Sequence, residues 1–206
     1  GEIGQINRLI FHHGNKGMQL SNNEIDNTFF RWLTDPVANG GGALMDFACY
    51  GLNILNWLTE GEIPVSTYAQ FNQYKPELYP DVEDDAVILL NYKNFQAILM
   101  ASWNWPIPRK DLQIYGRTGQ INIPSSHELT WQVNANKPKG LLAWPKTGYP
   151  INEPFEFLAD LIREQVVLDE YDLLSIENNL LVMQQLDIAK QSNSATKPIT
   201  IIQKVN

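Results

Sequence analysis

Alternating apolar and polar residues predict β-strands along most of the first two thirds of the chain. The period of two residues is clearest in residues 65–74, where one face would be buried and the other wet. Short connections, such as the turn at Lys93 and Asn94, favour antiparallel pairing between neighbouring strands. The strands that we expect are residues 3–13, 65–74, 86–92, 95–105, 109–115, 121–123, 127–133 and 199–202.

A helical period replaces the strand period in three segments. The first, residues 40–57, opens with three consecutive glycines, and the other two, residues 155–167 and 176–191, follow Pro154 and Ser175, which suit helix starts. The polar residues 14–27 and the Gly- and Pro-rich residues 137–154 are expected to be a loop or flap and an excursion. One early helix, two late helices and paired strands predict an α+β fold, an open and predominantly antiparallel sheet with helices on one face.

The helix predicted at residues 40–57 has two faces of different character. Asp46, Tyr50, Asn53 and Trp57 recur at i, i+4, i+7 and i+11, so they stack along one side. Because Asp46 lies in the first turns, the helix dipole favours its charged form. Two interpretations are open: an ordinary amphipathic helix whose polar side meets solvent, or a site that combines an anion, a phenol and an amide. The opposite, buried face would consist of Leu44, Phe47, Ala48, Gly51, Leu55 and Leu58.

Composition limits the classes of protein to consider. The 206 residues, 44% of them hydrophobic, can build one sizeable core, so residues 1–206 are expected to form a single domain. The net charge of -8 argues against nucleic acid or an anionic membrane surface as a partner. Cys49 is the only cysteine, which favours a reducing compartment and a cytoplasmic location. No apolar run approaches membrane-spanning length, and the missing initiating methionine suggests a piece of a longer protein.

Two further sets of side chains are candidates for ligand contacts. His12 and His13 are neighbours in a predicted strand, so they point to opposite sides and cannot share a metal ion; each is either structural or, for His13 in particular, a ligand contact. Asn104 lies between Trp103 and Trp105, and indole faces with an amide suit a sugar, although core or interface packing explains the tryptophans equally well. Strand alternation would place the two tryptophans on one face and Asn104 on the other. No metal site is expected, because acidic residues 81–85 lack the spacing of an EF-hand loop.

Residues 41–53 resemble the signature of the Gfo/Idh/MocA oxidoreductases. The family pattern is Gly-Gly-x-Leu-x-Asp-x-Gly-x-His-x-x-Asp, and this chain carries the two glycines, the leucine and Asp46 in the matching places. It departs from the pattern with Ala48 for glycine, Tyr50 for histidine and Asn53 for aspartate. With tyrosine in the position of the family histidine, this chain resembles the branch that contains glucose-fructose oxidoreductase and the dihydrodiol and xylose dehydrogenases.

Other parts of the chain resemble the same family. The Gly-x-x-Gly at Gly116 and Gly119 matches a family hairpin, and residues 186–192 are similar to the closing Leu-Asp-Ala-Ala-x-x-Ser. Leu33 occupies the place of a family arginine, and Arg31 is the residue that could substitute for it from a shifted position. The likeness covers essentially the whole chain but only the second half of a family enzyme.

The resemblance implies that this chain is the substrate-binding and oligomerisation domain of an NAD- or NADP-dependent oxidoreductase. A Rossmann domain, absent from this chain, would precede it and hold most of the cofactor, with Gly41 and Gly42 near the nicotinamide. Tyr50 would exchange a proton with a substrate hydroxyl group, and Asp46 would orient that hydroxyl. The remaining candidate substrate contacts are His13, Arg31, Asn53, Trp103 and Asn104.

The same resemblance implies the partners. The substrate would be a sugar, a polyol or a related hydroxylated ring, and the open face of the sheet would join copies into a homo-oligomer. This chain alone would be inactive, since it carries no glycine fingerprint for a dinucleotide. The alternative is a regulator or assembly module of the same fold that binds a sugar or dinucleotide without catalysis.

Overall fold

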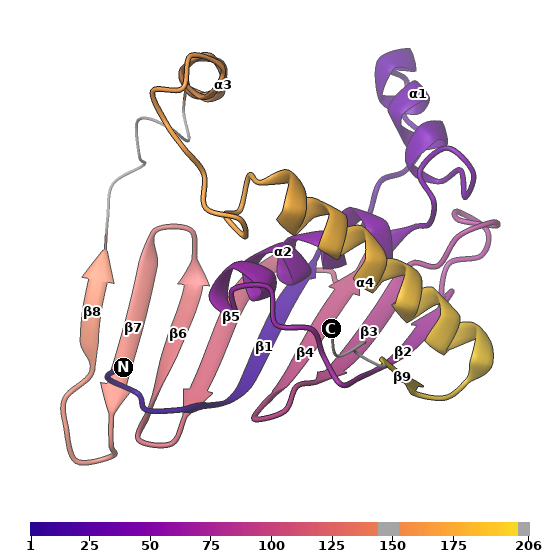
Figure 1. Cartoon of the computed structure of the whole chain (residues 1–206). Coiled ribbons are helices and arrows are strands. Elements are labelled where there is room, and N and C mark those ends of the chain that lie inside the picture. Colours follow the sequence, from indigo (N-terminus) through magenta and orange to yellow (C-terminus); the bar gives the residue numbers. More distant parts are fainter. Residues whose placement is uncertain (144–152, 202–206) are drawn as a thin grey trace.

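A nine-stranded sheet dominates the part of the chain that the computed structural model describes, residues 1–143 and 153–201. The strands lie in the order β8-β7-β6-β5-β1-β4-β3-β2-β9 (Figure 1). All neighbours in this sheet pair antiparallel except β1 and β4, which run parallel. The strands are β1 Ile6–Gly14, β2 Ser66–Asn72, β3 Asp85–Asn91, β4 Gln96–Ser102, β5 Arg109–Gly116, β6 Gly119–Ser125, β7 Glu128–Val133, β8 Gly140–Ala143 and β9 Ile199–Thr200.

Two helices cover one face of the sheet, and two others project from its end. In Figure 1, α2 and α4 lie across the strands from β5 to β2, whereas α1 and α3 rise beyond the same edge. A π-helical turn, η1, leads directly into α2. The helical segments are α1 Glu24–Leu33, η1 Leu44–Ala48, α2 Cys49–Leu58, α3 Pro154–Ile162 and α4 Ile176–Ala195.

Strand alternation sorts the side chains of β1 between the two faces. Leu9 and Phe11 are buried under the helices. Gly51 of α2 lies so close to β1 that an added Cβ atom would meet the Phe11 ring at 2.6 Å. This close approach fixes the start of α2 over the end of β1, where His13 reaches the helix-covered face and His12 the open face.

The predicted α+β fold is confirmed, and so are most of the predicted elements. The apolar face of residues 40–57 is buried as expected, with Leu44 and Leu55 fully inaccessible and Leu58 partly exposed. Gly61 ends that helix region at a φ of +76°, and the Ser175 hydroxyl accepts a hydrogen bond from the Asn178 amide at the start of α4. These are local features, which a linear pattern encodes directly.

The prediction of a single early helix was wrong, because α1 forms where a loop or flap was expected. Its signals were present in the sequence: Asn23 accepts a hydrogen bond from the Ile25 amide, and Glu24 and Asp26 lie in the first turn. The helix extends away from the sheet, but it is strongly amphipathic and buries Phe30 and Leu33, so an apolar stripe was a further signal in the sequence. β8 likewise forms inside residues 137–154, of which residues 144–152 lie outside the described part of the chain. Ile202, the last residue of the strand expected at the C-terminus, also lies outside it.

The expected shared face of Trp103 and Trp105 was also wrong. β4 ends at Ser102, so strand alternation stops before either indole. Trp103 is buried and contacts Asp46 on the helix-covered side, whereas Trp105 packs near His12 on the open side. The tryptophans therefore have separate structural settings.

Two features are absent from the described residues. None of the helices within residues 1–143 and 153–201 combines the length and apolar character needed to cross a bilayer. In those same ranges, no three His, Cys, Asp or Glu side chains gather in a way that could hold a metal ion.

Candidate functional site

The glycine bend before η1 is held by Glu83. The Glu83 carboxylate accepts hydrogen bonds from the amides of Gly42 (2.8 Å) and Leu44 (3.0 Å), and its backbone carbonyl accepts from the Ala43 amide at 3.0 Å. A Cβ atom on Gly42 would lie 1.9 Å from that carbonyl oxygen, so only glycine fits. The bend uses its amides internally, which fixes where the following helix starts.

Asp46 emerges from the π-helical turn beside a tryptophan. Its Oδ2 atom accepts a hydrogen bond from Trp103 Nε1 at 3.0 Å. Burial raises the pKa of the Asp46 carboxyl, and the hydrogen bond from Trp103 opposes that shift. A π-turn inserts one extra residue into the helical spiral and often occurs at functional sites. Here the carboxylate on this turn meets Trp103, the residue that follows the end of β4.

Tyr50 lies close enough to Asp46 for the two to interact electrostatically. The Tyr50 side chain is exposed, with 47% of its surface accessible. Its ring lies 5.1 Å from the His13 ring, and Lys110 Nζ is 4.2 Å from its centroid. Burial raises the pKa of the Tyr50 phenol, and the negative charges of Cys49 and Asp46 add to this effect. The phenol therefore needs a nearby cation to act as a base near neutral pH.

His13 joins this group from β1. Its ring stacks on Phe47 at 4.1 Å between centroids. Burial, together with the Lys110 charge, lowers the pKa of His13 to about 4. His13 is therefore neutral at physiological pH and suits hydrogen bonding more than ionic contact.

Lys110 is a site residue that the sequence interpretation missed. It comes from the start of β5, where it pairs with His13 of β1 in the sheet register. One signal was available: in strand 109–115, Lys110 shares its face with Leu112 and Ile114, so it is a cation on an apolar face. Burial of the ammonium lowers the pKa of Lys110.

The other predicted contacts are placed differently. Asn53 Nδ2 donates to the Leu173 carbonyl at 3.0 Å, and Asn104 Nδ2 donates to the Asp84 carboxylate at 2.7 Å. Arg31 is exposed on α1 and pairs with Glu24 at 2.8 Å. The structure brings together Asp46, Tyr50, His13 and Trp103, whereas these three side chains serve local contacts.

An apolar groove extends from Lys110 between α2 and the strands β5 and β6. It has a volume of about 530 Å³. Its walls are mainly apolar, with Phe11 at the base and Trp57 on the α2 side. A ligand whose polar end met Asp46 and Tyr50 could place an apolar part here.

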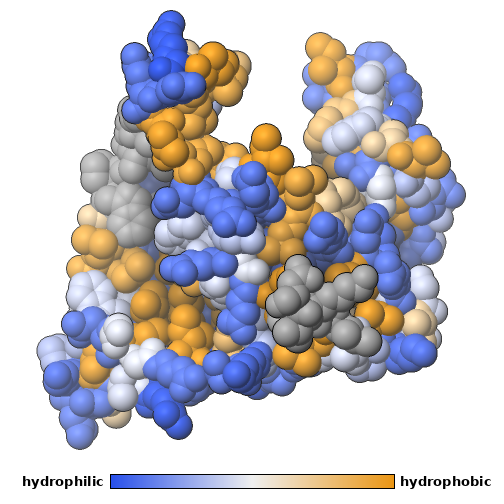
Figure 2. Space-filling model, viewed as in Figure 1, coloured by the Kyte–Doolittle hydropathy of each residue, from blue (hydrophilic) through white to orange (hydrophobic). Residues whose placement is uncertain are grey.

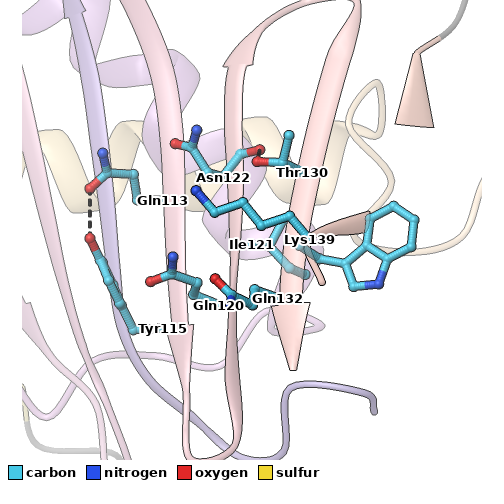
Figure 3. A pocket seen from close by; sticks show the side chains of 9 residues that line it. Gln113, Tyr115, Gln120, Ile121, Asn122, Thr130, Gln132 and Lys139 are labelled. Atoms are coloured by element: carbon cyan, nitrogen blue, oxygen red, sulfur yellow. Dashed lines mark hydrogen bonds between the residues drawn. The ribbon is translucent and has the colours of Figure 1, made fainter. Parts of the chain in front are cut away.

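A second hollow lies on the opposite face of the sheet, over β5, β6 and β7. Figure 3 shows it with the helices behind the strands, and its volume is about 190 Å³. Tyr115 there donates a hydrogen bond to Gln113 at 2.9 Å. Amides and hydroxyls predominate, with Lys139 reaching across them, and the lining contains neither an aspartate nor a histidine, the residue types of Asp46 and His13. This hollow is lined by Gln113, Tyr115, Gln120, Ile121, Asn122, Thr130, Trp131, Gln132 and Lys139.

Comparison with known proteins gives the family context. Residues 1–122 match the family described as the GFO/IDH/MocA C-terminal domain. A curated relative, trans-1,2-dihydrobenzene-1,2-diol dehydrogenase of Xenopus tropicalis, is 26% identical over 166 residues. That match covers 77% of this chain and 49% of the relative, so the chain spans about half the length of the curated protein it matches.

Solved structures share the fold at low sequence identity. The aldose-aldose oxidoreductase of Caulobacter crescentus, solved with glycerol, has a TM-score of 0.75 at 16% identity, covering 98% of this chain and 57% of its own. A levoglucosan dehydrogenase, solved with NADH and levoglucosan, has a TM-score of 0.75 at 17% identity, covering 99% of this chain and 61% of its own. Both likenesses establish the architecture of nearly the entire chain.

Proposed function

The chain belongs to the GFO/IDH/MocA family, and from this premise we propose that it is the substrate-side half of an NAD- or NADP-dependent oxidoreductase. The observation that carries the proposal is the meeting of Asp46, Tyr50 and His13 at one end of the sheet. The proposed substrate is a sugar, a polyol or a related hydroxylated ring. The name of the curated relative, a dehydrogenase of a ring diol, supports this class.

In the proposed mechanism, Tyr50 handles the proton of the substrate hydroxyl group. When an alcohol is oxidised, Tyr50 first gives its phenolic proton to solvent and the resulting phenolate accepts the hydroxyl proton; in reduction the neutral phenol donates its proton to the forming alcohol. Asp46 accepts a hydrogen bond from a substrate hydroxyl and holds the reacting carbon in place. Trp103 fixes the Asp46 carboxylate through its 3.0 Å hydrogen bond. The neutral His13 is placed to bond a second hydroxyl.

A nicotinamide cofactor would supply the hydride chemistry. The residues of this chain fit only the edge of such a group. The amides of Gly42, Ala43 and Leu44 are already bonded to Glu83, so the bend offers a wall and not a pyrophosphate cradle. We therefore assign cofactor binding mainly to a preceding Rossmann domain, with Gly41 and Gly42 forming the nicotinamide side of this half.

Two apolar helix surfaces support the proposal that such a domain packs on this end of the molecule. In Figure 2 the space-filling surface is hollowed between the projecting α1 and α3, and both carry hydrophobic patches. Phe29 and Trp32 of α1 are each 48% accessible, and Phe155 and Ile162 of α3 are exposed as well. Because this chain covers only 49% of the curated relative and 57% of the aldose-aldose oxidoreductase, a further domain has the size to cover both surfaces.

We propose that the open face of the sheet joins copies of the chain. Over β1, β4, β3 and β2 this face carries partly exposed apolar side chains, with Ile10, Val87 and Ile98 among them. Antiparallel sheets need a cover only on one face for their own stability, so an apolar second face suits a subunit contact. Sedimentation of the full-length protein would test this, since a monomer would contradict it.

The test of function is turnover by the full-length protein with aldoses and polyols and each nicotinamide cofactor. We expect Tyr50→Phe to lower turnover by about 100-fold or more, because it removes the proton-exchanging group. Tyr115→Phe is the matched control, since it removes the same hydroxyl group on the opposite face. Unchanged turnover in Tyr50→Phe would remove this residue from the mechanism.

A non-catalytic regulator of the same fold is the second candidate. The observation that favours it is the engagement of Asn53, which stands in a signature position but bonds Leu173. Binding of a sugar or dinucleotide without any turnover across the panel would support the regulator and contradict the enzyme.

A further inference from the structure

The phenol of Tyr50 lies in surroundings that disfavour its ionised form. Its neighbours include the Asp46 carboxylate, which repels a phenolate, and Cys49, which adds to that repulsion only once its thiol ionises. Cys49 is held as a thiol, because burial raises its pKa to about 11. His13, the other titratable neighbour, is neutral above a pKa of about 4. Within the described residues these groups provide no compensating positive charge.

Lys110 supplies that charge from β5. Its Nζ atom lies 4.2 Å from the centroid of the Tyr50 ring, which is the geometry of a cation–π contact. In the described part of the chain, the salt bridges do not include Lys110, so its charge is not neutralised by a carboxylate there. The neighbouring cation, Arg109, points to the other face and pairs with Asp111.

We propose that Lys110 is a positioning residue for Tyr50, whose ammonium group holds the phenol ring and stabilises negative charge on its oxygen. The inference rests on the proposed function for its catalytic meaning, and it assigns a role within this chain that the family signature at residues 41–53 does not contain. Lys110 keeps its own proton throughout, and the substrate proton moves only to Tyr50. An ammonium over an electron-rich ring gains more when that ring carries a phenolate.

The register of the sheet explains why this pair can form. Lys110 lies opposite His13 in the β1–β5 pairing, and His13 stacks on Phe47 of η1. The close packing of Gly51 on Phe11 holds the first turn of α2 against the same strand. Tyr50 therefore lies within reach of His13 on β1 and of Lys110 on β5, and the lysine stem needs no rearrangement to reach it.

The direct test is ionisation of Tyr50 in the full-length protein, followed by tyrosine ring-carbon NMR and assigned with Tyr50→Phe. Because burial lowers the pKa of Lys110 and raises that of Tyr50, the two groups lose their protons in overlapping pH ranges, and the charged reference is Lys110→Arg, which stays protonated. We expect the pKa of Tyr50 to be about half a unit to one unit higher in Lys110→Met than in Lys110→Arg, allowing for solvent screening. The ionised fraction at a pH of about 10 would then be about three- to tenfold lower in Lys110→Met. Lys110→Gln is a second neutral variant in case the methionine disturbs folding.

Two variants control for the positive charge at residue 110 and for the face of the sheet on which that charge lies. Lys110→Arg keeps the positive charge at every pH of the titration and is the charged reference. Arg109→Gln removes a cation one residue away on the opposite face and should leave the Tyr50 titration of the unmodified protein unchanged. Equal titration of Tyr50 in Lys110→Arg and in both neutral variants would overturn the inference.

Kinetics then separate this inference from the proposed function. If Tyr50 is the base, the rate of alcohol oxidation should rise at a pH about half a unit to one unit higher in Lys110→Met than in Lys110→Arg. A shift in Tyr50 ionisation without any dehydrogenase turnover would support the lysine–tyrosine pair and contradict the enzyme. If turnover depends on Tyr50 but the titration of Tyr50 does not respond to substitution of Lys110, the enzyme would be supported and the lysine–tyrosine pair contradicted.

Discussion

Two charged clusters lie on opposite sides of the sheet, separated by a single position on β1. On the open side, His12 Nδ1 lies 3.2 Å from Asp111, and Arg109 bonds the same carboxylate. On the helix-covered side, Asp46 and Lys110 form no ion pair within the described residues. The first cluster is neutralised internally, which suits a structural role. The second keeps its charges available around a phenol, which suits binding and proton exchange.

The largest expected effect distinguishes the carboxylate of Asp46 from that of Asp111. We expect Asp46→Asn in the full-length protein to lower turnover by about 100-fold, because a neutral amide holds a substrate hydroxyl in the wrong alignment. Folding should survive, since the amide oxygen still accepts the hydrogen bond from Trp103. Turnover assays and urea denaturation of the same preparation measure both.

Asp111→Asn is the counterpart on the open side. It should keep turnover but lower the free energy of unfolding by about 1–2 kcal/mol, because the bonds from Arg109 and His12 lose their charge. Equal loss of turnover in the two variants would show that the clusters do not differ in role.

The next effect concerns the glycine bend that precedes Asp46 and Tyr50. Gly42→Ala should lower the free energy of unfolding by about 1–3 kcal/mol, because its Cβ would overlap the Glu83 carbonyl. Gly41→Ala is the matched control, since its closest contact is the flexible Met45 side chain at 3.0 Å. Urea denaturation should show the larger loss at Gly42, and equal losses would argue against the clamp by Glu83.

The smallest effect is a dependence of stability on pH. The pKa of His13 falls from 6.5 to about 4 on folding, so between these values the unfolded chain binds a proton that the folded chain does not. Stability should therefore decrease as pH falls from 6.5 toward 4. Because Phe keeps the stacking on Phe47 but cannot titrate, His13→Phe should reduce this decrease.

Urea midpoints at pH 7 and pH 5 provide the measurement, and substitution of the exposed His127 is the control. His12 contributes in the same direction, because burial lowers its pKa too. A slope in His13→Phe as steep as in the unmodified protein would assign the effect to His12 and the open side.

Local sequence signals predicted most of the secondary structure and several buried positions. Alternation located the strands, and helical spacing placed Leu44 and Leu55 in the core. The same spacing put Asp46 and Tyr50 on one side of a helix, and their catalytic roles remain predictions. The missed helix α1 had a clear N-cap at Asn23, so the sequence did contain a helix signal there, and too much importance was given to the polar composition of residues 14–27.

Contacts between distant strands could not be predicted in this way. The hydrogen bond from Trp103 to Asp46 joins the residue after β4 to η1, and the position of Lys110 over Tyr50 joins β5 to α2. Both depend on the register of β1 with its two neighbours, one parallel and one antiparallel. Periodicity reports which way a side chain points within its own strand, but it carries no information about which strand lies beside it.

The sequence by itself determined the element types, the buried face of the helix region at residues 40–57 and the spacing of Asp46 and Tyr50, because these follow from backbone periods over a few residues. Only the tertiary structure decided that Glu83 holds the glycine bend and that Lys110 and His13 meet Tyr50. Those contacts arise from packing between segments far apart in the chain, where burial and charge act across the sheet and not along it.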